Sequence, residues 1–200
     1  MKSSEIRPSD YRKAEYPLEP LFLERWSARA MSGEAVAEKD LMTLFEAARW
    51  APSPMNVQNW HYCYALKPSA EFDLFFSFLA AGNQEWCRQA GALIAAIDQT
   101  LNDDGKPVMS HRFNLGLSVE NLLLQARAMN LVAHPMLGFN AENAAKGLNL
   151  PEGYEVAAMI AVGHFGEIEN LSEKLQAREV PSDRKPLKDF VHRGTPSPKK

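Results

Sequence analysis

Residues 47–60 read AARWAPSPMNVQNW, and in this stretch a helical pattern stops and a polar loop begins. Neither Pro52 nor Pro54 can continue a helix or donate a backbone hydrogen bond, so the chain must leave the helix here. The loop then carries one hydroxyl and three carboxamides, on Ser53, Asn56, Gln58 and Asn59. Carboxamides offer donors and acceptors in one plane, which suits the edge of a flat heterocycle. The same residues are also common in turns and caps, so this stretch by itself favours a plain loop.

The composition around this loop is that of one globular domain. The 200 residues are 46% hydrophobic and 24% charged, and the formal net charge is −3. A chain of this length buries roughly 70% of the surface that it exposes when unfolded, which is enough for a substantial core. The net charge argues against a nucleic-acid partner, since such proteins carry a broad basic field. No apolar run reaches the length of a membrane span, so no membrane partner is expected.

The cysteines and the chain ends favour a cytoplasmic location. The spacing of Cys63 and Cys87 matches no metal or redox motif, and free cysteines are typical of a reducing compartment. The opening MKSSEIRPSDYRKAEYP lacks the apolar core of a signal peptide. We therefore predict a polar N-terminal arm at residues 1–17, one domain at 18–193 and a disordered tail at 194–200.

Helices and buried strands are predicted to alternate along the domain. Apolar residues recur at helical spacing in 38–50, 70–81 and 111–130. Gly82 and Asn83 are expected to end the second of these helices. Buried strands are predicted at 60–67, 92–98 and 155–163, and a short strand begins LVAHPMLGFN at 131–140, with Pro135 and Gly138 bracketing a turn.

A second polar cluster lies in RWSAR, residues 25–29. Alternate residues of an extended chain point the same way, so Arg25, Ser27 and Arg29 would converge on one side. Two guanidinium groups and a hydroxyl can hold a phosphate or another oxyanion. A solvated charged turn is the alternative, and it is the commoner outcome for such a triplet in isolation.

Well-known catalytic and nucleotide-binding motifs are absent. The chain has no GxGxxG, GxxxxGK[ST], HExxH or GxSxG pattern, and its scattered acidic residues mark no pair of general acid and base. His134 in HPMLGF is a candidate proton donor or a hydrogen-bonded turn histidine. These observations leave the function open.

Five short motifs, taken in order and at their intervals, resemble the flavin-dependent nitroreductase-like family. They are RWSAR, AARWAPSPMNVQNW, HPMLGF, IAVG and DRKPL, and the resemblance covers about residues 21–191. The most specific is WAPSPMNVQNW, because the family has an A-P-S run followed by N-x-Q-P-W there. The resemblance implies an α+β fold, a three-layer α-β-α sandwich with a central, mostly antiparallel sheet. It also implies a domain-swapped homodimer that binds FMN at the subunit interface.

The resemblance implies four groups of FMN-binding residues. The phosphate and ribityl chain would be held by Arg25, Trp26, Ser27 and Arg29. The flavin ring would be contacted from one loop by Ser53, Asn56 and Gln58. One face of the ring, with a backbone N–H directed toward N5, would be lined by Pro135, Met136, Leu137 and Gly138. Two basic residues near the end of the chain would close over the phosphate, namely Arg184 and Lys185.

The implied activity is that of an FMN-dependent oxidoreductase. Hydride would pass from NADH or NADPH through flavin N5 to a small acceptor such as a nitroaromatic, a quinone or an enone. The chemistry belongs to the flavin, so no catalytic side chain and no metal is predicted. One alternative is a protein that stores or senses FMN without significant turnover. Another is a helical dimerisation module without a ligand, which leaves the five motifs unexplained.

The sequence departs from the family pattern at three positions. Asn59 stands where the family usually has Pro, and Asn114 lies in the long helix near the place of a common acidic residue. Leu137 stands where some relatives have Glu. A ring contact at Leu137 would be made by the backbone, so FMN binding survives this change, whereas the preference for nicotinamide or substrate can differ.

Overall fold

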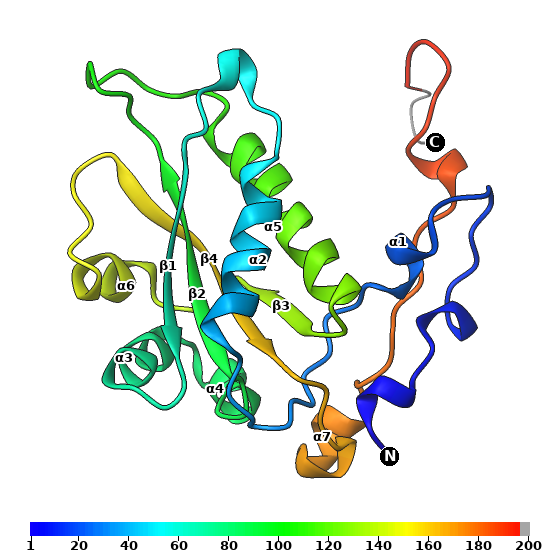
Figure 1. Ribbon diagram of the computed structural model, residues 1–200. Helices are drawn as coiled ribbons and strands as arrows, with labels where there is room; N and C mark the ends of the chain where they lie inside the picture. The colour runs from blue at the N-terminus through cyan, green and yellow to red at the C-terminus, as the bar shows by residue number, and fades with distance from the viewer. Residues whose placement is uncertain (197–200) are drawn as a thin grey trace.

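A four-stranded antiparallel sheet forms the centre of the molecule in a computed structural model that describes residues 1–196 (Figure 1). The strand order is β1-β2-β4-β3. The strands are β1 (Trp60–Leu66), β2 (Ala92–Gln99), β3 (Val132–Met136) and β4 (Tyr154–Gly163). The first seven residues of β2 are buried, which explains why its sequence is a continuous apolar run and does not alternate.

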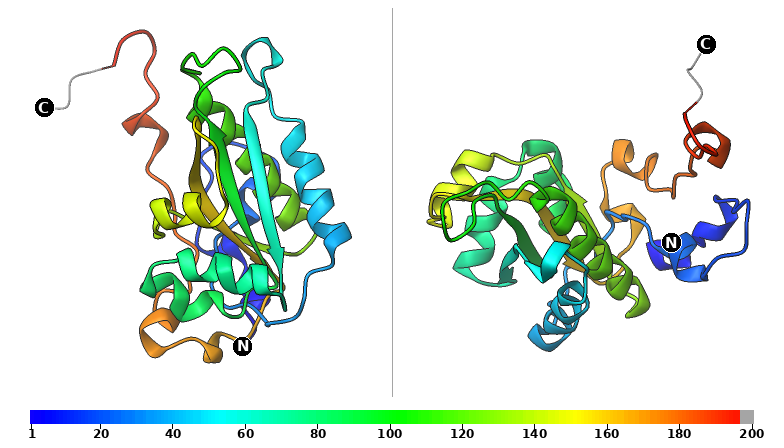
Figure 2. Two further views of the ribbon diagram at one scale, coloured as in Figure 1. Left: turned by 90° about the vertical axis from the view of Figure 1, so that its left-hand side faces the viewer. Right: turned by 90° about the horizontal axis from the view of Figure 1, so that it is seen from above.

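Helices cover both faces of this sheet and complete three layers (Figures 1 and 2). Helices α2 (Glu38–Arg49) and α5 (His111–Ala128) pack on one face, and α3 (Ala70–Phe78), α4 (Ala81–Cys87) and α6 (Ala141–Gly147) pack on the other. Successive strand residues point to opposite faces, so Leu93 joins the core under α3 and Ile94 joins the core under α2 and α5. The predicted α+β class is confirmed.

The break between α3 and α4 was predicted wrongly. Gly82 and Asn83 lie inside α4 and do not end the preceding helix, which stops at Phe78. The chain leaves α3 because Leu79 adopts an extended conformation (φ −70°, ψ 142°) and forms an isolated bridge with Phe139. A tertiary contact therefore ends this helix, and local composition does not reveal it.

Pro135 was also predicted in the wrong element. It lies inside β3, opposite Ile160 of β4, and the turn follows the strand. β3 is an edge strand, where the missing N–H of a proline is tolerated.

The two ends of the chain lie together, away from the sheet (Figure 1). The N-terminal residues form η1 (Ser3–Glu5), η2 (Pro8–Asp10) and α1 (Pro20–Glu24). Beyond β4 the chain forms η4 (Ile168–Asn170), α7 (Glu173–Gln176) and η5 (Leu187–Asp189). Arg12 joins the two ends, since its Nε donates to the Ser182 carbonyl at 2.9 Å and its Nη1 donates to the Leu23 and Arg25 carbonyls, both at 2.6 Å.

Four residues of the predicted C-terminal tail, 197–200, fall outside the described part of the chain. No helix within residues 1–196 combines the length and the apolar character that crossing a membrane requires.

Candidate functional site

A cleft of about 270 Å³ lies between the paired chain ends and β3. It is lined by Arg12, Arg25, Trp26, Ser27, Arg29, His134, Arg178, Val180, Pro181, Ser182 and Arg184. Five of these side chains are arginines. The cleft is therefore strongly basic in a chain of net charge −3, and it suits an anion with several oxygens.

Residues 25–29 belong to no helix, and their burial alternates along the segment, as an extended conformation requires. Trp26 and Ala28 are buried, with exposed fractions of 7% and 0%, which turns the intervening side chains toward the cleft. Arg25 Nη1 donates to Ser27 Oγ at 3.3 Å. The two guanidinium groups and the hydroxyl thus line one space, as the triplet requires for an oxyanion site.

A buried carboxylate fixes this segment. Glu179 is 1% exposed, and its Oε1 accepts from the backbone N–H of Arg29 at 2.6 Å and of Ala30 at 2.8 Å. Arg29 Nη1 lies 3.5 Å from Glu179 Oε2. The charge of Glu179 is compensated by these three donors, and the backbone beneath the cleft is held in place.

His134 forms the wall of the cleft on the side of β3. Its Nδ1 donates to the Ala28 carbonyl at 3.0 Å, and its ring lies 4.6 Å from that of Trp86. Burial, together with the smaller effect of the charges of Arg29 and Arg25, lowers the pKa of His134 to about 4. The ring is therefore neutral near pH 7 and leaves Nε2 as an acceptor, which favours the hydrogen-bonded role over that of a proton donor.

The segment after β3 continues from this wall. Met136 is buried against Cys87, with 3.4 Å between the two sulfurs, whereas Leu137 is 81% exposed. The Gly138 carbonyl accepts from Ala80 N and Asn83 Nδ2, both at 2.9 Å. Within residues 1–196, the backbone N–H groups of Leu137 and Gly138 donate to no acceptor. They remain available to a ligand edge beside the cleft.

The loop after α2 is shaped by its own hydrogen bonds. Ser53 Oγ accepts from the Gln58 backbone N–H at 3.0 Å, and Gln58 Nε2 donates to the Asn56 carbonyl at 3.0 Å. Met55, Asn56 and Gln58 have φ values of 51°, 58° and 47°, which are uncommon for residues other than glycine. Such strain persists only where the surroundings impose it, and it is frequent at functional sites.

One chain brings together only part of the predicted site. Arg25, Trp26, Ser27, Arg29 and Arg184 line the cleft, while Lys185 lines an adjacent groove between the chain ends. None of the residues that line the cleft comes from the loop of Ser53, Asn56 and Gln58, which stands at the top of the sheet in Figure 1, away from residues 25–29.

Sequence reasoning missed two arginines of the cleft, Arg12 and Arg178. Arg12 belongs to the polar arm and reaches the cleft by a contact with Ser182, 170 residues away. Burial lowers the pKa of Arg12, as do the charges of Arg184 and Arg25. No local pattern marks either arginine, because folding of the two chain ends brings them in.

Two of the departures from the family pattern touch each other. Asn114 Nδ2 donates to Asn59 Oδ1 at 2.6 Å, and the two residues are 0% and 2% exposed. The contact joins α5 to the end of the loop that precedes β1. Asn59 and Asn114 thus form a buried pair, and the two departures share one structural role.

Comparisons with known proteins agree on one family. The model of the Nitroreductase family matches residues 23–72 and 64–164. A crystal structure described as an oxidoreductase containing FMN is 38% identical, with a TM-score of 0.91 over 94% of this chain and 97% of that chain. A candidate nitroreductase from Desulfovibrio desulfuricans, solved in complex with FMN, is 26% identical, with a TM-score of 0.69 over 92% of this chain and 100% of that chain. The Bacillus subtilis protein MhqN, named as a candidate NAD(P)H nitroreductase, is 24% identical over 84% of this chain and 93% of its own length.

Proposed function

Because the chain belongs to the nitroreductase family, we propose that it is an FMN-dependent oxidoreductase that takes a hydride from NADH or NADPH and delivers it to a small acceptor. The observation that carries this proposal is the basic cleft, which continues into a segment with free backbone N–H groups. FMN has a phosphate at one end and a flat heterocycle at the other. The basic cleft suits the phosphate, and the free backbone N–H groups suit the edge of the heterocycle.

The cleft fits the phosphate. A phosphate monoester carries nearly two negative charges near pH 7 and accepts several hydrogen bonds, for which guanidinium groups are the preferred donors. Glu179 offsets the charge of Arg29, and the charges of Arg25 and Arg178 remain for an anion. The Ser27 hydroxyl adds an uncharged donor on the same side.

The segment after β3 fits the ring. The N–H groups of Leu137 and Gly138 offer donors to an acceptor nitrogen or oxygen of a heterocycle. The neutral His134 stands between this segment and the cleft, so it adds no charge where the ribityl chain would run. Its free Nε2 can accept a hydrogen bond from a hydroxyl.

The residues of the chain bind and orient the reactants, and none is assigned a covalent or proton-transfer role. FMN, when bound, supplies the redox chemistry, which is hydride uptake from the nicotinamide and hydride release to the acceptor. Nitroaromatics, quinones and enones are the proposed acceptors, because a flat and open site suits planar electron-poor compounds.

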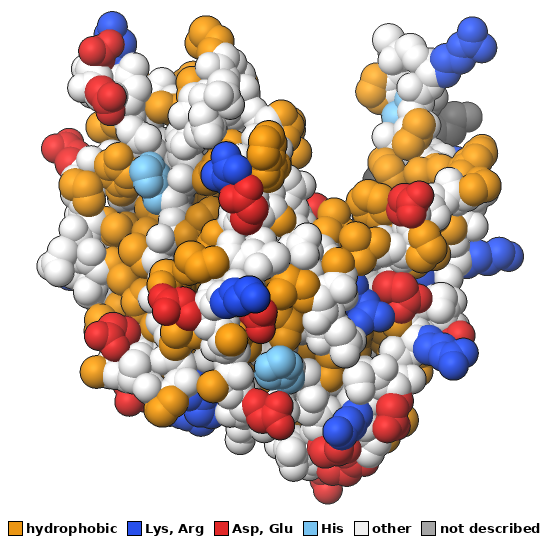
Figure 3. All heavy atoms as spheres, in the orientation of Figure 1, with side chains coloured by type: hydrophobic (Ala, Val, Ile, Leu, Met, Phe, Trp, Pro, Cys, Tyr) orange, Lys and Arg blue, Asp and Glu red, His pale blue; other side chains and the backbone are white. Residues whose placement is uncertain are grey.

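A second copy of the chain is the proposed source of the missing loop. The groove between the chain ends has a volume of about 370 Å³ and presents apolar side chains, among them Phe22, 54% exposed, and Phe190, 59% exposed. Figure 3 shows the hollow between the body of the molecule and the paired ends, with apolar side chains along both walls. Single proteins rarely expose such patches without a partner. We place Ser53, Asn56 and Gln58 of one protomer at the FMN site of its partner, in a homodimer with exchanged chain ends.

An absorbance experiment tests the function. The purified protein is reconstituted with FMN, and its spectrum is followed without oxygen while NADH and then NADPH are added. Bleaching of the flavin band, restored by a quinone or a nitroaromatic, is the expected result and identifies the donor. Bound flavin that neither nicotinamide bleaches would favour the storage or sensing alternative, and failure to bind FMN would remove the proposal.

A further inference from the structure

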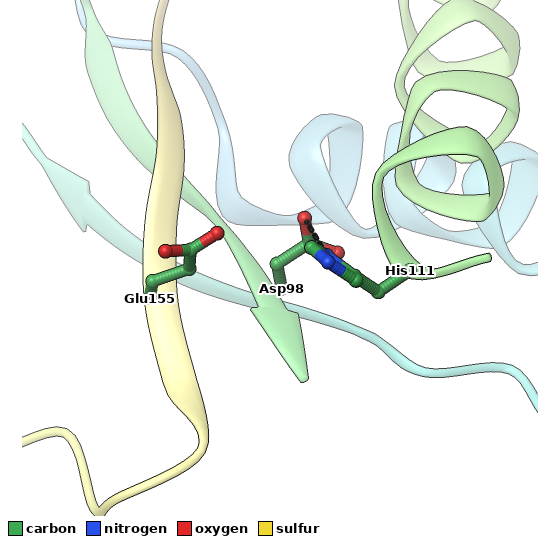
Figure 4. Close-up of side chains that lie close together, drawn as sticks. All are labelled: Asp98, His111 and Glu155. Atoms are coloured by element: carbon green, nitrogen blue, oxygen red, sulfur yellow. Dashed lines mark hydrogen bonds and ion pairs between the residues drawn. The ribbon is translucent and has the colours of Figure 1, made fainter. Parts of the chain in front are cut away.

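Three side chains with metal-binding atoms meet at one end of the sheet, and none of them lines the basic cleft. Asp98 lies near the end of β2, His111 is the first residue of α5, and Glu155 lies near the start of β4 (Figure 4). One donor atom from each lies within 4.8 Å of the others. Figure 4 shows the Glu155 carboxylate directed toward Asp98, with His111 on the other side of Asp98.

The two carboxylates are direct neighbours across the sheet. Asp98 pairs with Glu155 in the register of β2 and β4. Like charges in this arrangement destabilise a sheet, since opposite side chains lie only about 5 Å apart. A positive charge between the two carboxylates would convert this repulsion into attraction.

The groups around the pair leave Asp98 incompletely compensated. Asp98 is 0% exposed, and its Oδ2 contacts His111 Nδ1 at 2.9 Å. Its Oδ1 has no hydrogen-bond partner among the described residues. Glu155 is paired with Arg112 through Oε1 only, at 2.5 Å, and the Arg112 side chain is 65% exposed. Buried carboxylate oxygens almost always have a partner, so the free Oδ1 indicates a missing one.

We propose that Asp98, His111 and Glu155 bind a divalent transition-metal cation of the Zn²⁺ type. One imidazole nitrogen and two carboxylates are a donor set that such cations accept, and water completes the coordination. Binding through His111 Nδ1 takes the neutral tautomer of the ring with its proton on Nε2, because the lone pair of Nδ1 becomes the ligand.

The site needs a small contraction to close on the ion. Donors bound at about 2.0–2.2 Å lie roughly 3–3.5 Å apart around a cation, which is less than the present limit of 4.8 Å. Glu155 can supply this movement, since its side chain is 43% exposed and only one of its oxygens is held by Arg112. Asp98 and His111 already lie at the distance of two ligands that share an ion.

The ion would join three elements at the base of the loop after α2. The segment that connects β2 to α5 begins next to Asp98 and ends at His111. An ion bound to both residues would therefore hold the two ends of this segment together. Gln99, the neighbour of Asp98, donates its backbone N–H to the Asn59 carbonyl at 3.1 Å. The proposed role is therefore structural, and it does not depend on FMN binding.

Calorimetry with Zn²⁺ tests the site. The full-length protein is treated with a chelator, dialysed and titrated with ZnCl₂ near neutral pH, and its melting temperature is measured with and without the ion. We expect one Zn²⁺ per chain and a higher melting temperature when it is bound. His111→Gln and Glu155→Gln should each weaken Zn²⁺ binding by at least about 10–100-fold. That is the loss typically seen when a residue that only hydrogen-bonds to a metal ligand is replaced, and these variants replace the ligands themselves.

Matched controls separate this site from other surface groups. Glu152→Gln, Asp104→Asn and His192→Gln change exposed residues and should leave the affinity for Zn²⁺ unaltered. Titration heats equal to those of buffer, or binding that neither His111→Gln nor Glu155→Gln weakens, would overturn the proposal. If one of these variants does not fold, as judged by circular dichroism, the other decides, because both side chains are partly exposed.

Discussion

The guanidinium of Arg25 has few partners of its own. Among the described residues, it donates only to Ser27 Oγ, at 3.3 Å, which leaves most of its N–H groups for a ligand. Arg25→Ala should weaken FMN binding by about 1.5–3 kcal/mol, the value of a hydrogen bond to a charged group, or roughly 10–150-fold in Kd. Quenching of flavin fluorescence measures this. Arg88→Ala is the control, since Arg88 is paired with Asp73 on the surface and lies outside the cleft. An unchanged Kd for Arg25→Ala would exclude Arg25 from the phosphate site.

His134 gives the FMN-free protein a specific dependence on pH. Its pKa is lowered to about 4 in the folded chain from an ordinary value of 6.5, so between these values only the unfolded chain takes up a proton. The contribution of His134 to the free energy of unfolding is therefore fully present above about pH 6.5. It is lost as the pH drops toward about 4, and the loss is at most about 3 kcal/mol.

Urea unfolding at pH 7, 6 and 5 measures this effect. His134→Gln should lose less stability over this range than the unaltered chain, because glutamine does not titrate. His192→Gln, at an exposed position, should keep the original slope. Equal slopes for His134→Gln and the unaltered chain would contradict the role of His134.

At the scale of elements, the buried amide pair couples α5 to the start of β1. Asn59→Ala and Asn114→Ala should each destabilise the protein, and the double variant should lose about 0.5–1.5 kcal/mol less than the sum, because both single variants break the same hydrogen bond. Chemical denaturation of the four proteins gives the coupling energy. Asn59→Ala combined with Asn143→Ala, on the exposed side of α6, should be additive within about 0.5 kcal/mol. A coupling energy of zero for Asn59 and Asn114 would show that their contact contributes nothing.

Hydrophobic period predicted the strands and the long helices well. The continuous apolar run of β2 is buried as predicted, and so are Leu115, Leu122 and Ala126 of the predicted face of α5. The predicted burial of the first strand was wrong, because β1 is an edge strand in which only Ala65 is buried. The break at Leu79 escaped prediction because a bridge to Phe139 ends α3, and the two residues are far apart in sequence. A sequence pattern reflects the local preference of the chain. It does not predict the end of a helix that is determined by a tertiary contact.

The candidate site likewise contains residues that a local pattern identifies and residues that only tertiary contacts bring in. The alternation in RWSAR showed which side chains an extended segment would bring together, although a solvated turn is the commoner outcome for such a triplet, and these side chains do line one cleft. Two arginines that line the cleft, Arg12 and Arg178, come from opposite ends of the chain, and Glu179 holds the backbone beneath it. Arg12 and Glu179 contact residues that are 150 or more positions away in the sequence, so no local motif marks them. The contact between Asn59 and Asn114 was hidden for the same reason, although the sequence identified each position as unusual.

At the scale of the whole molecule, the exposed chain ends predict the oligomeric state. If the proposed homodimer forms through the apolar groove, Phe190→Asp places a charge in the interface and should shift the protein from dimer to monomer, with loss of bound FMN. Sedimentation velocity and the flavin content after gel filtration measure the two effects. Leu74→Asp, at a 40% exposed position on α3, is the control and should remain dimeric. A Phe190→Asp protein that stays dimeric would exclude this groove from the interface.

The separation of the loop of Asn56 from the arginine cleft has a consequence for mixed subunits. If each site takes its cleft from one protomer and its loop from the other, a hybrid of one Arg25→Ala chain and one Asn56→Leu chain has both defects in one site and neither in the second. At an FMN concentration that fills native sites but not those of either variant, the two homodimers, unfolded and refolded together, should thus regain about a quarter of the native activity, since half of the assemblies are hybrids with one intact site each. Such complementation is impossible if every site is built within one chain.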